Sequence, residues 1–269
     1  MQTCLARLYV DEGFRATFLD DPAAALAGSD VAPAEAAAIA AIDLRMLVAF
    51  AATLYTKRKK RFQRAYAASF AWREPVMDAA LRRFLETHGT RPAGSGHLDI
   101  HYFGCFAEQE LASGDRPDGA AADLVRFERL SHDATLAHPE PPEAGDVPQP
   151  EPRDVPVRVP GVQVDDFRYD VVAMDAALRA GDPIASPQLA ATTLVLRPGP
   201  VDDGEQRILR MNGAAAMVLR LCEGRTVAAI VHAVETRLAA TDLADAVRDT
   251  VRRLCALHIV SLSPRRAGP

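Results

Sequence analysis

Apolar residues recur three or four positions apart along the first half of the chain, which is the spacing of one face of an α-helix. This pattern predicts helices over 4–19, 33–42, 76–87, 98–111 and 120–136, a short helical turn over 23–26, and a long helix that begins at Leu44, runs through Tyr66 and ends at Arg73-Glu74-Pro75. No alternating apolar and polar run, the pattern of a half-buried strand, precedes residue 138. We therefore expect an all-α helical domain over residues 1–138.

A proline-rich segment follows these helices. Residues 138–160 hold eight of the 19 prolines of the chain. Because proline fixes φ and lacks an N–H donor, we expect no regular core element there. We place a semi-rigid linker at 139–156 and a second domain at 157–269.

The second domain mixes strands and helices. The runs 188–196 and 205–212, joined through a Pro-Gly-Pro turn, predict a β-hairpin, and 155–164 offers a further strand. A helix over 171–180 is stopped by Gly181 and Pro183. Three more helices are predicted over 213–221, 227–238 and 243–257, capped by Asn212, Thr226 and Thr241, before a short extended end at 258–264. The whole chain is therefore expected to be α+β.

Composition narrows the classes of function. Hydrophobic residues make up 49% and charged residues 25% of the 269 positions, which are globular values. No membrane span or secretory signal is visible, so we expect a cytoplasmic protein that does not bind membranes. The four widely spaced cysteines form neither a disulfide framework nor a zinc motif. A net charge of −5 disfavours nucleic acid as a partner.

The hairpin and the three helices after it have a familiar arrangement. The segments LRMNGAAAMVLRLCEGRTVAAIVHAVETRL and DLADAVRDTVRRLCALHIVSL resemble the PqqD-like family, the recognition elements of ribosomally made, modified peptides (RiPPs). The resemblance covers roughly residues 190–262. It implies a winged-helix-like domain with a small antiparallel sheet and three helices, which binds the leader of a precursor peptide.

The layout of the whole chain resembles a narrower group. Its opening, FRATFLDDPAAALAGSDVAPAEAAAIAAIDLRMLVAF, is similar to that of the partner proteins of multinuclear non-haem iron oxidases, as in methanobactin-type pathways. The resemblance implies a non-catalytic subunit of a hetero-oligomer. Such a subunit holds no cofactor, because the iron belongs to the oxidase, and it presents the core of the precursor peptide to that iron.

In the PqqD-like relatives the leader lies along the last hairpin strand, against the third helix. An open strand edge is suited to this role, since its free N–H and C=O groups can pair with an extended peptide. The positions that correspond here are Gln206, Arg207, Ile208, Leu209, Arg210 and Met211 on the strand and Arg248 and Arg252, with Arg253, on the helix. These arginines predict a basic groove for an acidic leader; alternatively, they are a solvated surface.

All three lysines of the protein lie in one run, Thr56–Arg64, with Tyr55, Phe62 and Tyr66 interleaved. The run can contact nucleic acid, dock an acidic partner surface, or form a solvated helix face whose aromatic residues enter the core. A second stretch, 102–106, is either core or an apolar patch for an enzyme subunit. As the oxidase-docking residues we select Lys57, Arg58, Lys59, Lys60, Arg61, Tyr102, Phe103 and Phe106.

No catalytic constellation is evident. His97 and His101 share a helix face, but a third metal ligand is missing, and the neighbours Ser131, His132 and Asp133 do not by themselves make a triad. A different class, a DNA-binding winged-helix regulator, remains the alternative. It is disfavoured by the negative net charge and by the apolar face of the third helix, with Leu243, Val247, Val251 and Leu254.

Overall fold

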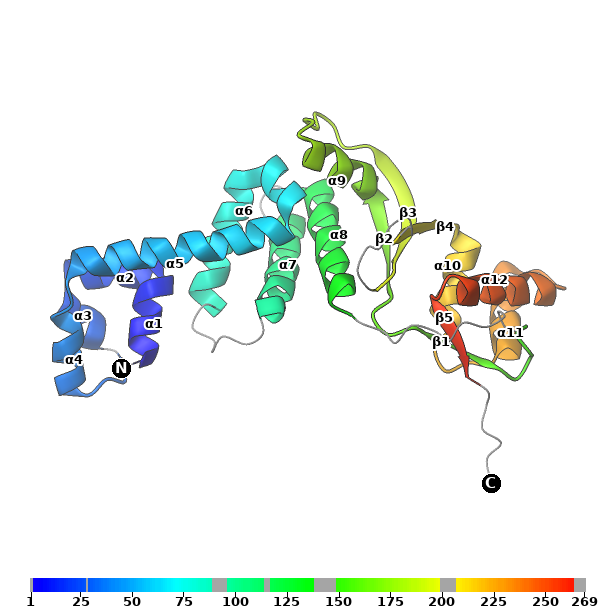
Figure 1. The fold of residues 1–269 in the computed structure, drawn as a ribbon, viewed down its shortest axis with the longest axis horizontal. Helices are drawn as coiled ribbons and strands as arrows, with labels where there is room; N and C mark the ends of the chain where they lie inside the picture. The colour runs from blue at the N-terminus through cyan, green and yellow to red at the C-terminus, as the bar shows by residue number, and fades with distance from the viewer. Residues whose placement is uncertain are drawn as a thin grey trace, which may run out of the picture. The chain divides into compact units, whose positions relative to one another are not determined.

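The computed structural model describes residues 2–27, 29–88, 96–113, 117–137, 149–198 and 207–263 (Figure 1). The chain forms two compact units. The first consists of residues 1–129 and 171–187, and the second of residues 130–170 and 188–269. The fold is α+β, as expected, with helices in both units and strands in the second.

The first unit is built from helices. They are α1 (Gln2–Val10), α2 (Glu12–Asp20), α3 (Pro22–Ala27), α4 (Pro33–Ala40), α5 (Leu44–Ala65), α6 (Ala67–His88), α7 (Gly96–Ser113), α8 (Gly119–Leu136, which continues into the second unit) and α9 (Val171–Ala180). No single helix in the described ranges is both long and apolar enough to cross a bilayer, although α4 and α5 taken together, bent by 85°, meet that test.

Two helices that the apolar spacing predicts as continuous are each divided in the structure. Asp11 separates α1 from α2, and its carboxylate accepts a hydrogen bond from the Phe14 N–H at 2.8 Å, which caps α2. The long helix ends at Tyr66, whose backbone leaves the helical region (φ −117°, ψ 49°). The predicted break before Pro75 is present as a kink at Arg73 inside α6.

Two hydrophobic clusters stabilise this unit, and α5 contributes to both. Its first half places Leu47 among Leu8, Phe18 and Ile39. Its second half places Phe62 in an aromatic cluster whose centre is the fully buried ring of Phe103. The 22-residue helix α5 therefore connects the two clusters within one unit.

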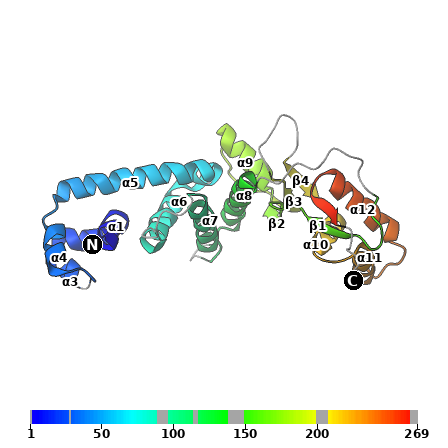
Figure 2. The ribbon, with the colours of Figure 1, turned by 60° about the horizontal axis from the view of Figure 1, so that its bottom comes forward.

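The second unit holds two antiparallel sheets. Strand β2 (Gln163–Tyr169) pairs with β3 (Leu189–Leu196), which pairs with β4 (Ile208–Met211). Strand β1 (Val155–Arg158) pairs with β5 (Val260–Ser263), and the two lie side by side in Figure 2. The predicted hairpin is confirmed as β3–β4, while the segment 155–164 contributes to two strands, and the second of these extends to Tyr169.

Three helices complete the second unit: α10 (Gly213–Leu221), α11 (Val227–Leu238) and α12 (Ala244–Ala256). The predicted caps Asn212 and Thr226 accept hydrogen bonds from Ala215 N–H and Ala229 N–H. The predicted cap Thr241 is wrong, because α12 begins later, after Leu243. The carboxylate of Glu235 on α11 accepts the Leu243 N–H instead.

The compact units differ from the predicted division in three places. Residues 130–137, predicted as part of the helical domain, cluster with the second unit. Helix α9 and the residues up to 187 cluster with the helical unit, where α9 contacts α6. Residues predicted as the end of the linker belong to the second unit. There the carbonyls of Pro152 and Asp154 accept the Ala228 and Val227 N–H groups at the start of α11. Residues 138–148, the remainder of the proline-rich segment, lie outside the described residues.

Candidate peptide-binding site

Strand β4 is the terminal strand of its sheet among the described residues. The Arg197 N–H donates to the Arg207 carbonyl at 2.9 Å, so positions 197 and 207 form a hydrogen-bonded pair. Such pairs recur at every second residue of an antiparallel ladder. Leu209 and Met211 therefore direct their backbone groups toward β3, while Ile208 and Arg210 direct theirs away from it.

The two faces of β4 differ in the same alternating way. The side chains of Leu209 and Met211 pack against the buried cluster that includes Val247 and Val251 of α12. Ile208 and Arg210 alternate with them and project from the opposite face. Strand and helix thus share a core, and the outer edge of β4 offers the N–H and C=O groups of two residues.

Arg210 has an acidic partner. Its Nη2 lies 2.7 Å from Oδ1 of Asp170, and its side chain is half exposed. The sequence does not single out Asp170, since it precedes a predicted helix and no local pattern links it to β4. Asp170 directly follows β2, across β3 from the free edge of β4, so the ion pair connects β4 with the other side of the sheet and leaves the guanidinium half exposed.

Arg207 has a structural role. Its Nε donates to the Arg197 carbonyl at 3.0 Å and its Nη2 to the Ser131 carbonyl at 2.7 Å. Burial lowers the pKa of this guanidinium. Arg207 therefore anchors the hairpin rather than lining an open groove. Gln206, the first predicted site residue, lies outside the described residues.

The arginines of α12 pair with aspartates of the same helix. Arg248 lies 2.7 Å from Asp245, and both Arg252 (2.6 Å) and Arg253 (2.8 Å) contact Asp249. The hydrogen bond from Arg252 lowers the pKa of Asp249. Three cations and two anions leave this surface only slightly positive, which is less basic than the sequence predicted.

The predicted docking run on α5 has a mixed environment. Lys57 and Lys60 are exposed, whereas Lys59 lies 3.1 Å from Glu74 and 2.8 Å from Asp78. Arg58 is partly buried, and Arg61 lies 3.9 Å from Asp99. Only part of the run is therefore a free charged surface.

The predicted aromatic docking residues separate into three environments. Phe103 is fully buried against Phe62 and Tyr66, so its assignment to a docking surface is wrong. Phe106 is partly buried beside Phe84, and Tyr102 is 46% exposed. The reason is helical geometry, which directs adjacent residues to different faces of α7.

In the described parts of the chain, no group of three or more His, Cys, Asp or Glu side chains could hold a metal ion. His101 Nε2 lies 3.7 Å from Cys105 Sγ, one turn along α7, and the side chain of His97 lies outside the described residues. Ser131, His132 and Asp133 are successive residues of α8.

Comparison with known proteins gives one result for this unit. No curated protein matches the chain. Residues 200–260, which include β4, α10, α11 and α12, match the family model described as Coenzyme PQQ synthesis protein D (PqqD). This part of the chain is therefore similar to the PqqD family.

Proposed function

We propose that the second unit binds the leader of a ribosomally made precursor peptide by adding it as a strand to the outer edge of β4. The observation that carries this proposal is the orientation of Ile208 and Arg210, whose backbone N–H and C=O groups point away from β3. Main-chain hydrogen bonds then supply affinity, and side-chain contacts supply specificity. The similarity to the PqqD family supports the same role.

The leader is acidic in this proposal, at least where it passes Arg210. Arg210 is a residue of β4 itself, and its side chain is half exposed. An acidic residue of the leader can therefore contact its guanidinium together with Asp170. The α12 arginines contribute less, since each already contacts an aspartate. The test is titration of the full chain with a synthetic leader peptide by fluorescence anisotropy, in which saturable binding is expected. A scrambled leader that binds equally well would contradict sequence-specific recognition.

The helical unit would hold the enzyme that modifies the bound peptide. We assign this enzyme to the multinuclear non-haem iron oxidases and the present chain to the role of a non-catalytic partner in a hetero-oligomer. The exposed Lys57 and Lys60 on α5 support a docking role, because rims of interfaces are polar and charged. Holding the leader near the oxidase would raise the effective concentration of the core peptide at the iron.

Co-purification tests the partner assignment. The full chain should co-elute with a tagged iron oxidase encoded beside its own gene, and the precursor should be modified only when both proteins are present. The full chain is required, because α9 belongs to the helical unit and a fragment ending at residue 138 would lack it. Modification by the oxidase alone would contradict the proposal.

A further inference from the structure

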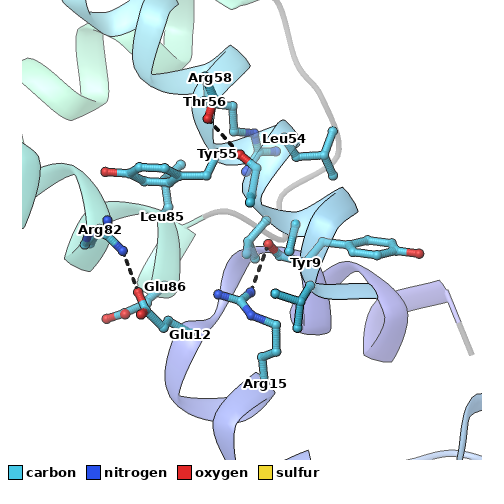
Figure 3. A pocket seen from close by; sticks show the side chains of 14 residues that line it. Tyr9, Glu12, Arg15, Leu54, Tyr55, Thr56, Arg58, Arg82, Leu85 and Glu86 are labelled. Carbon is cyan, nitrogen blue, oxygen red and sulfur yellow. Dashed lines mark hydrogen bonds and ion pairs between the residues drawn. The ribbon is translucent and has the colours of Figure 1, made fainter. Parts of the chain in front are cut away.

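A pocket of about 260 Å³ opens in the helical unit between α1, α2, α5 and α6 (Figure 3). Its walls are largely apolar, with Ala51 and Leu85 buried at the base and the rings of Tyr9 and Tyr55 at the sides. The volume is that of one or two side chains rather than of a large cofactor. The polar residues that line it are Glu12, Arg15, Thr56, Arg58, Arg82 and Glu86.

Two of the three arginines in this pocket already have partners within the helical unit. Nη1 of Arg82 lies 2.6 Å from the Glu12 carboxylate, and its guanidinium lies over the Tyr55 ring, 4.6 Å from the centroid. Arg15 donates to the Leu8 carbonyl at 3.0 Å, at the end of α1. These groups stabilise the contacts between the helices.

Arg58 is different. Its Nη1 is buried and has no hydrogen-bond partner among the residues that the structure describes, and within the same residues its guanidinium forms no ion pair. Burial lowers its pKa, while the charge of Asp99 acts in the opposite direction. A buried guanidinium N–H without an acceptor is a donor that a carboxylate of a ligand would satisfy.

The surface around the pocket is larger than a small molecule would cover. Val48, which lines the pocket, is 43% exposed, and Phe50, which packs edge-on against Tyr9, is 49% exposed. Lys57 and Lys60 are exposed too, but they lie on a different face of α5 from Val48, Ala51 and Tyr55 and do not line the pocket. An apolar hollow that includes a buried guanidinium N–H without a partner among the described residues is complementary to an apolar side chain that adjoins a carboxylate.

We propose that this pocket receives an anchor segment of the partner enzyme, in which an apolar side chain enters between α5 and α6 and an adjacent carboxylate contacts Arg58. This inference rests on the proposed function, since it specifies where and by what chemistry the oxidase docks. It also separates the two binding events, because the pocket lies in the helical unit and the leader site in the other.

The experiment measures the affinity of the full chain for the oxidase by isothermal titration calorimetry. Arg58→Glu should weaken binding by about tenfold or more, since it replaces the donor by a like charge. Ala52→Phe, which fills the pocket without changing charge, should weaken it as well. Arg237→Glu makes the same charge change at an exposed position of α11 and should leave the affinity unchanged. All three variants should bind the leader as the wild type does, and their circular dichroism spectra and thermal melts should match those of the wild type, which shows that the helical unit is folded.

The outcomes distinguish the pocket from the partner assignment. If the wild type binds the oxidase and both pocket variants bind equally well, the pocket inference is wrong and the partner assignment stands. If the wild type binds no such oxidase, both are wrong. As a probe of a small-molecule site, 3-phenylpropionate can be titrated and followed by NMR. Saturation by this carboxylate with no effect on oxidase affinity would overturn the docking role.

Discussion

The carboxylate of Glu128 on α8 caps the start of α6 through Ser69. Its Oε2 accepts the Ser69 hydroxyl at 2.6 Å and the Ser69 N–H at 3.1 Å, while Oε1 accepts the Ala68 N–H at 2.8 Å. Glu128 is almost fully buried, with the Arg179 guanidinium 3.5 Å away. The backbone N–H groups in the first turn of a helix have no acceptor within the helix, and the Glu128 carboxylate accepts two of them at the start of α6. This explains why a new helix begins after Tyr66 instead of α5 continuing.

Glu128 should make stability depend on pH. Burial raises its pKa to about 7, although the hydrogen bonds from Ser69 and Ala68 oppose the shift. A raised folded-state pKa stabilises the protein below the unfolded value near 4.5, and that contribution is lost as pH rises through about 7. Between pH values below 4.5 and pH values above 7, the titration of Glu128 should lower the free energy of unfolding by roughly 3 kcal/mol.

Urea denaturation from pH 4.5 to about 8 measures this effect. The variant Glu128→Gln does not titrate, so its stability should change less with pH than that of the wild type. Parallel pH profiles for the two proteins would show that Glu128 is not the responsible group.

Proline substitutions at the adjacent residues Ile208 and Leu209 of β4 should have opposite effects on folding and on leader binding. Ile208→Pro removes an N–H that points away from β3, so the fold should survive and leader binding should be lost. Leu209→Pro removes an N–H that faces β3 and should destabilise the second unit. Circular dichroism together with leader titration separates the two effects. Leader binding by a folded Ile208→Pro variant would exclude strand addition at this edge.

Charge at the same edge should also matter. Arg210→Glu replaces the cation beside an acidic leader and should weaken binding by about 1–3 kcal/mol, the range for hydrogen bonds to charged groups. Arg225→Glu, at an exposed position before α11, is the matched control and should have no effect. Increasing salt should reduce the difference between wild type and Arg210→Glu. Equal leader affinities for both variants would remove Arg210 from the site.

Gly104 on α7 should not tolerate a side chain. A Cβ there would clash with the Tyr66 hydroxyl, which donates to the Ile100 carbonyl at 2.7 Å, and with Cδ of Arg129. Gly104→Ala should therefore destabilise the helical unit by about 1–3 kcal/mol through overpacking. Gly13→Ala, whose Cβ would meet only an ordinary contact with Asp11, serves as the control. A thermal melt in which both variants resemble the wild type would contradict the clash.

Thiol alkylation should distinguish Cys105 from the other cysteines. Cys105 is exposed, whereas Cys4, Cys222 and Cys255 are buried. Burial also raises the pKa of Cys222 to about 12 and that of Cys255 to about 11, so little thiolate is present to react. Iodoacetamide followed by peptide mass spectrometry should find the native protein modified at Cys105, with the other three labelled after unfolding. Native labelling of Cys222 would show that the second unit opens readily.

Local signals allowed much of the fold to be predicted from the sequence. The caps Asn212 and Thr226 act on N–H groups three residues away, so short motifs suffice to locate α10 and α11. The break at Tyr66 depends on Glu128, about 60 residues later, and no neighbouring residue announces it. For the same reason the sequence does not show the ion pair between Arg210 and Asp170, since the two residues are 40 positions apart and come together only when β2, β3 and β4 form one sheet.

In the candidate site, too, local features could be predicted from the sequence, whereas contacts between distant residues could not. The resemblance to PqqD-like proteins indicated which residues form the edge strand, and the structure places Leu209 and Met211 together against the core. Charge was predicted less well, because the sequence shows the arginines of α12 but not which aspartates neutralise them. The burial of Phe103 likewise depends on packing between α5, α6 and α7, which helical spacing alone does not specify.

The pairing of β1 with β5 has a consequence for synthesis in the cell. Val157 and Ser261 are register partners although 104 residues separate them along the chain. During translation β1 must wait for β5 to leave the ribosome, so this two-stranded sheet closes only after residue 263 has emerged. Nascent chains halted before residue 260 should therefore contain the helical unit, while their second unit lacks the pairing of β1 with β5. If leader capture needs the complete second unit, it would begin only after β5 has left the ribosome.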